Sequence, residues 1–112
     1  MNIEVSPEVL VTQLGYSNNK SSINKAEKII SNTNQFNKFS KHIISFHDQI
    51  KKMNAYITFS NKQSYLKIKC DENDSKQILE EFHNEVKNWS AKYDLELKKI
   101  DERPIYYILG KN

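Results

Sequence analysis

Hydrophobic residues in the segment 35–53 recur every three or four positions, which is the spacing of one face of an α-helix. This face carries Phe36, Phe39, Ile43, Phe46, Ile50 and Met53. A coiled coil would show similar spacing, but the segment is short and its core positions hold bulky phenylalanines. We therefore expect a helix that buries this face against a sheet.

From residue 55 the hydrophobic period changes to two, which is typical of half-buried strands. Segments 55–59 and 65–70 flank the polar turn 60–63, so they predict a hairpin. One face is apolar, with Ala55, Ile57, Phe59, Leu66, Ile68 and Cys70. The other face carries Tyr56, Thr58, Tyr65, Lys67 and Lys69.

A second helix and hairpin are predicted after residue 74. Asp74 or Ser75 can cap a helix with an apolar side that contains Ile78, Leu79, Phe82, Val86, Trp89 and Tyr93. Strands are expected at 95–100 and 105–109 around the turn 101–104. The last strand is apolar at every position. We expect Ile105, Tyr107 and Leu109 to fill the core and Tyr106 and Ile108 to need a separate cover.

The N-terminal third predicts two further helices. Residues 2–5 could form a brief strand or an ordered tail. Ser6 and Pro7 then indicate a helix start and Gly15 its end, and Ser21 or Ser22 can cap a second helix through Ile30.

The expected fold class is therefore α+β. N-terminal helices are followed by α-β-β-α-β-β, with one four-stranded antiparallel sheet and helices packed on one face. The 112 residues suit a single domain, 1–112.

An internal repeat of segments 35–70 and 74–110 is one interpretation of this pattern. The pair Phe46 and His47 matches Phe82 and His83, and both copies run into two short strands. The alternative is two unrelated amphipathic helices of similar composition, because the second copy carries one extra residue, which rotates the helix face after it.

Charge is unevenly distributed along the chain. The net charge is +3, but residues 1–70 carry ten lysines against four carboxylates, whereas residues 71–112 are net acidic. This asymmetry is compatible with an anionic partner, with head-to-tail pairing of two copies, or with an ordinary solvated surface. A single cysteine and the lack of a long apolar run predict a cytoplasmic protein with no membrane contact and no disulfide-linked partner.

Motifs for catalysis are weak. Gly15 and Gly110 are isolated, so the sequence contains no phosphate-binding glycine loop. The three histidines lack ligand spacing, and Cys70 falls on an apolar strand face, which is typical of an inert core thiol. We expect no catalytic residues, no bound metal and no cofactor, and therefore no enzyme.

A noncatalytic protein-interaction module that associates with itself is the first functional hypothesis. The expected homodimer buries the strand 105–109 against its own copy, with Ile105, Tyr106, Ile108 and Arg103 at the interface.

A nucleic-acid-binding protein that uses the basic N-terminal half is the alternative. Its contacts would be Tyr56, Tyr65, Lys67 and Lys69 on the sheet, or Lys20, Lys25 and Lys28 on a helix. A small-ligand or enzymatic pocket between helices and sheet is the third hypothesis.

Overall fold

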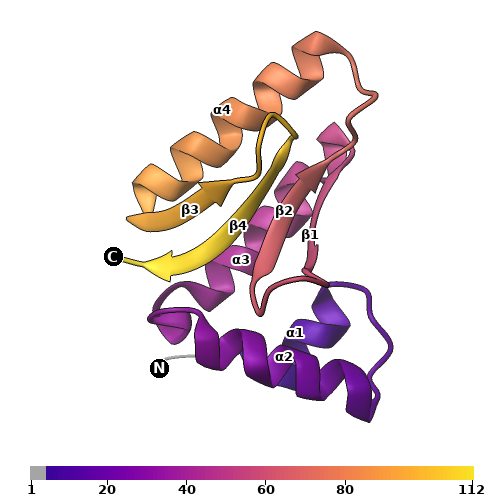
Figure 1. Ribbon diagram of the computed structural model, residues 1–112, viewed down its shortest axis with the longest axis vertical. Coiled ribbons are helices and arrows are strands. Elements are labelled where there is room, and N and C mark those ends of the chain that lie inside the picture. The colour runs from indigo at the N-terminus through magenta and orange to yellow at the C-terminus, as the bar shows by residue number, and fades with distance from the viewer. Residues whose placement is uncertain (1–4) are drawn as a thin grey trace.

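The computed structural model describes residues 5–112, so the strand or tail predicted at 2–5 lies outside the described residues except for Val5. Four helices and four strands follow one another in the predicted order (Figure 1). Their bounds are α1 Pro7–Gln13, α2 Lys20–Asn32, α3 Phe36–Ile50, the 3₁₀ turn η1 Lys51–Met53, β1 Ala55–Phe59, β2 Leu66–Cys70, α4 Lys76–Lys92, β3 Leu95–Lys99 and β4 Ile105–Lys111. The α+β fold class is confirmed.

The four strands form one antiparallel sheet in the order β1-β2-β4-β3. In Figure 1, α3 lies behind β4 and β2, α4 runs alongside β3, and α1 and α2 lie at the lower end of the sheet. The strands β1 and β3 are therefore the two edges. No described helix covers the front of the sheet.

The core lies between the sheet and α3 with α4. Alternation places Ala55, Ile57 and Phe59 of β1 beside Leu66, Ile68 and Cys70 of β2, and all six side chains are buried. The predicted helix faces meet them. Phe46 of α3 stacks on Trp89 of α4 with ring centroids 4.4 Å apart, so the two helices contact each other directly.

Helices α1 and α2 extend this core beyond the end of the sheet. Ser6 caps α1 as expected, since its side chain accepts a hydrogen bond from the Val9 amide. The α2 cap is Asn19, so the prediction of Ser21 or Ser22 is wrong by half a turn. Asn, like Ser, offers a side-chain oxygen to the first free amides, and the sequence presents both.

The junction between α2 and α3 is fixed to the last strand by Asn34. Its backbone amide donates to the carbonyl of Leu109 and its carbonyl accepts from the amide of Lys111, so it continues the ladder beyond the end of β2. Gly110 permits this approach, because a Cβ there would lie 2.6 Å from Asn34 backbone and side-chain atoms. A glycine is thus required at this position.

The two helix–hairpin units, α3-β1-β2 and α4-β3-β4, meet through β2 and β4. Phe46 and Phe82 are both buried. Their neighbouring histidines differ, because His47 bonds to the first strand of its own hairpin and His83 to the second. The internal repeat stays a prediction.

None of the helices within residues 5–112 combines the length and the apolar character that a membrane-spanning helix needs.

Candidate binding face

The front of the sheet carries the tyrosine and lysine side chains predicted for the polar face of the first hairpin. Tyr56 and Thr58 of β1 lie directly opposite Lys69 and Lys67 of β2, and residues opposite one another in a sheet share a face. Tyr56 is 41% exposed. Within the described chain these side chains lack a helical cover, so we name this surface, with Tyr65 and Tyr107, the open face.

Strand β4 contributes Ile105 and Tyr107 to the open face, which corrects the prediction that they fill the core. They pair directly with Lys69 and Lys67 of β2. In β4, the residues that face the core and those that face the front of the sheet are therefore the reverse of the prediction. Every position from 105 to 109 is apolar, so the pattern itself could not choose between the two faces.

The reversed phase of β4 also changes where the residues of the predicted dimer interface lie. Ile108 is fully buried in the core, and Tyr106 packs against Phe82 and His83 of α4. Strand β4 also has a neighbour on both sides, β2 and β3, so it offers no free edge to a second copy. Of the predicted interface residues, only Arg103 is exposed.

Two tyrosines form an aromatic pair at one end of the open face. The rings of Tyr65 and Tyr107 have centroids 6.3 Å apart, and the Ser60 hydroxyl donates a hydrogen bond to the Tyr107 hydroxyl at 3.3 Å. The Tyr107 side chain therefore reaches across β2 towards the end of β1. Its ring is held in place, which lowers the entropic cost of stacking a flat ligand on it.

A basic groove of about 450 Å³ adjoins the open face at Ser60. Its walls are α2 and the β1–β2 loop, and its cations are Lys25, Lys28 and Lys62. No carboxylate lines it among the described residues. Lys25 also donates to the Asn61 side chain at 3.1 Å, which holds the loop against the helix.

The opposite end of the open face is mixed in charge. A hollow of about 480 Å³ there is lined by Tyr56, Lys69 and Arg103, together with carboxylates of Asp71 and Glu72. Arg103 donates to Glu72 at 2.6 Å, so its charge is already partnered. The face is thus most cationic at its centre and at the groove end.

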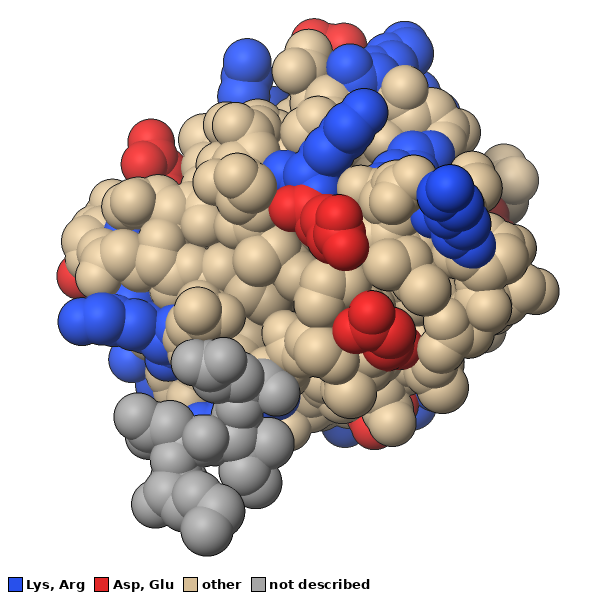
Figure 2. All heavy atoms as spheres, turned by 90° about the horizontal axis from the view of Figure 1, so that it is seen from below, with Lys and Arg blue, Asp and Glu red and all other residues tan. Residues whose placement is uncertain are grey.

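The N-terminal helices do not form a continuous basic surface. Figure 2 looks onto the end of the molecule where α1 and α2 lie, and its blue groups stand apart on a largely tan surface with red groups among them. The excess of lysines in the N-terminal half of the sequence is therefore spread over the surface and does not form one basic patch there. The groove and the open face remain the places where lysines share a wall with aromatic or polar groups.

The histidines and the cysteine serve structural contacts. His42 stacks on Tyr93, and the Nδ1 atoms of His47 and His83 bond to the Ile57 amide and the Tyr106 hydroxyl. Burial lowers the pKa of each histidine, with lysine neighbours adding to the effect. Each of these three rings is therefore harder to protonate than a free imidazole.

Cys70 is buried, and its Sγ lies 3.4 Å from the Met53 carbonyl. Burial, and secondarily the Asp74 carboxylate, raises the pKa of this thiol to about 11. The protonated thiol is a poor nucleophile. Among residues 5–112, no group of three histidine, cysteine or acidic side chains gathers at a metal-binding distance.

Sequence reasoning found the five open-face residues of the first hairpin but missed Tyr107 on that face and the contact made by Tyr16. Tyr16 stacks on Phe59 and its hydroxyl bonds to the Thr58 hydroxyl and the Phe59 amide. Nothing in its local sequence signals this contact.

Comparison with known proteins adds no relative: no family model, no curated protein and no solved structure matches this chain.

Proposed function

We propose that the protein is a noncatalytic module that binds single-stranded nucleic acid on the open face. The observation that carries the proposal is the presence of three tyrosines and two lysines, from three adjacent strands, on the sheet face that no described helix covers. Aromatic rings on such a face stack bases, and lysines between them meet phosphates. Within residues 5–112, neither Lys67 nor Lys69 is engaged in an ion pair.

The basic groove continues the proposed nucleic-acid-binding surface beyond the open face. A strand that stacks on Tyr65 and Tyr107 would continue past Ser60 to Lys25, Lys28 and Lys62. The two lysine sets weighed from the sequence, one on the sheet and one on a helix, are then parts of one surface. The carboxylates of Asp71 and Glu72 disfavour phosphate at the other end of the open face. A bound strand would therefore leave the open face at the groove end.

Fluorescence anisotropy with labelled oligo(dT) and oligo(U) at several salt concentrations tests this proposal. Affinity is expected to fall steeply with salt, because phosphate contacts release counterions. The variant Lys67→Glu/Lys69→Glu should bind at least about tenfold more weakly and reduce the logarithmic salt slope by about 1.4, that is about 0.7 per lost phosphate contact.

A matched control is Lys38→Glu/Lys41→Glu. Both residues are exposed on α3, on the other side of the sheet, and the net charge changes equally. If this control lowers affinity as much as the open-face variant does, binding depends only on net charge. Absence of binding at low ionic strength also contradicts the proposal.

A protein-interaction module is the second candidate. The observation in its favour is that the Tyr56 and Tyr107 rings of the open face are at least partly exposed, while Ile105 between the strands is already buried. A docked protein would cover these side chains. In that case oligonucleotides fail to bind, and a partner's affinity falls on Tyr107→Ala with little dependence on salt.

A further inference from the structure

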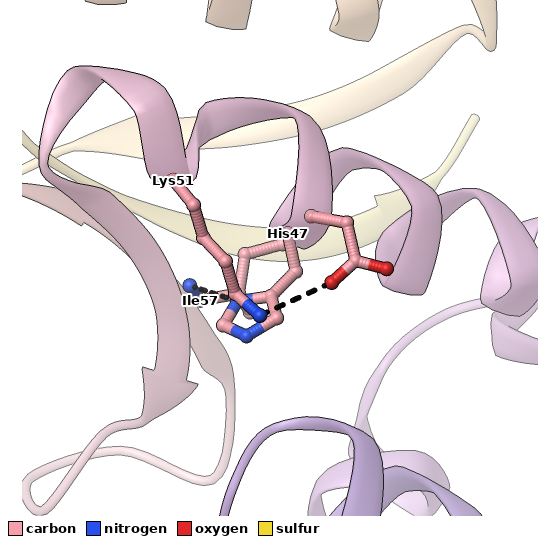
Figure 3. A network of polar contacts seen from close by, with 4 residues as sticks. His47, Lys51 and Ile57 are labelled. Atoms are coloured by element: carbon pink, nitrogen blue, oxygen red, sulfur yellow. Dashed lines mark hydrogen bonds and ion pairs between the residues drawn. The ribbon is translucent and has the colours of Figure 1, made fainter.

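The two edge strands of the sheet, β1 and β3, differ in whether side chains accept hydrogen bonds from their outward-facing backbone amides. On β1, the Ile57 amide donates to His47 Nδ1 at 2.9 Å and the Phe59 amide donates to the Tyr16 hydroxyl at 3.0 Å, so two outward-facing amides of this edge are satisfied by side chains. Figure 3 shows the His47 ring placed against this strand. Side chains used in this way close an edge to further strands.

The β3 edge is open. The Ile100 amide donates to the Ile105 carbonyl, so by alternation Lys98 also faces β4 and the backbones of Leu97 and Lys99 face away from the sheet. Among the described residues, no side chain bonds to these two amides. An unpaired edge of this kind is a template for another strand.

We propose that β3 pairs antiparallel with β3 of a second copy, with the two-fold axis at Leu97. This register places Glu96 opposite Lys98 of the second copy and Lys98 opposite Glu96 of the second copy. Both side chains are exposed, and opposite charges directly across a strand pair stabilise it. The strand is thus complementary in charge to its own copy.

The apolar side of the edge supports the same register. A groove of about 440 Å³ between α4 and β3 is lined in part by Val86, Leu97 and Tyr106. Leu97 is only partly buried there. On the two-fold axis the two Leu97 side chains lie next to each other, and the leucine of each copy fills the apolar part of the groove of the other.

This dimer has one continuous eight-stranded sheet. A two-fold axis through an antiparallel strand pair runs perpendicular to the sheet, so the two open faces lie on the same side. Glu96 and Lys98 lie on the same side of the sheet as Tyr107, which pairs with Lys98, but the proposed contact itself is made by the backbone edge of β3. Dimerisation is measured without nucleic acid, so its failure is distinguishable from a failure of nucleic-acid binding.

Charge reversal tests the register by analytical ultracentrifugation at micromolar to millimolar concentration. The wild-type chain should sediment at twice its 13.2 kDa mass as concentration rises. Lys98→Glu and Glu96→Lys each place like charges opposite one another, and each should weaken the dimer about tenfold or more. The double variant Glu96→Lys/Lys98→Glu should restore it. Failure of this rescue overturns the proposed register.

Cysteine pairs give a second readout. Positions 96 and 98 of the two copies form a non-hydrogen-bonded pair, with Cα atoms about 4.5 Å apart, which a disulfide can bridge. The oxidised variant Glu96→Cys/Lys98→Cys should run as a covalent dimer without reductant. Tyr56→Cys/Thr58→Cys on the closed edge should stay monomeric. A wild-type chain that is monomeric throughout, with no cross-link at 96 and 98, overturns the proposal.

Discussion

The imidazole of His47 accepts a hydrogen bond from the backbone amide of Ile57, with Nδ1 and N 2.9 Å apart (Figure 3). The ring is 5% exposed and comes from α3, whereas the amide belongs to the edge strand β1. One side chain therefore satisfies a buried donor, positions a helix on the sheet and closes the strand edge. Nδ1 must be unprotonated for this bond to form.

Replacing His47 by Phe should destabilise the protein by about 1 to 3 kcal/mol at pH 7.5, because the Ile57 amide then has no acceptor. Urea unfolding followed by circular dichroism measures this change. His47→Gln, whose side-chain oxygen can accept from the amide, is the matched variant and should recover part of the loss.

The same bond makes stability depend on pH. Burial lowers the pKa of folded His47, so below pH 6.5 the unfolded state takes up a proton that the folded state does not. Stability is complete above about pH 6.5 and falls as the pH decreases. His42 and His83 act in the same direction, so the Phe variant should show a smaller pH slope rather than none. An unchanged slope would contradict this role.

Gly110 is expected to be far less tolerant of substitution than Gly15. A Cβ at Gly110 would meet Asn34 at 2.6 Å, and its φ of +144° is disfavoured for other residues. Gly110→Ala should cost about 3 kcal/mol or more. Gly15 has φ +86° with no atom within 4 Å of a Cβ, so Gly15→Ala should cost only about 1 to 2 kcal/mol. Equal costs in thermal unfolding would contradict the Asn34 contact.

The first hairpin could be predicted from the sequence almost residue by residue. Its apolar and polar positions alternate strictly, so β1 Ala55–Phe59 and β2 Leu66–Cys70 follow directly. The phase of β4 could not be predicted. It is set by the pairing of β2 with β4, which puts Ile105 opposite Lys69, and that is a contact between distant segments.

The candidate site could likewise be predicted from the sequence for the first hairpin but not for β4. Tyr56, Tyr65, Lys67 and Lys69 were found because they belong to the alternating hairpin. Tyr107 was missed with the phase of its strand. The closed β1 edge was also missed, since a tertiary contact from Tyr16 leaves no local pattern.

Cys70 should be inert in the folded protein. Its thiol is buried and its pKa is raised to about 11, so the thiolate that reacts with electrophiles is scarce at neutral pH. Iodoacetamide at pH 8 should label it only after unfolding in urea, as measured by intact mass. Rapid labelling of the native chain would show that the 66–70 strand opens readily.

The location of the ligand is the central claim, and an NMR titration tests it most directly. Uniformly ¹⁵N-labelled protein at low salt is titrated with oligo(dT), and amide shifts are mapped onto the structure. We predict that the largest changes fall on Tyr56, Tyr65, Lys67, Lys69 and Tyr107, with smaller ones along the basic groove. The exposed side of α3 around Lys38 and Lys41 should stay unchanged. Shifts confined to the helical side, or none at low salt, would contradict the account.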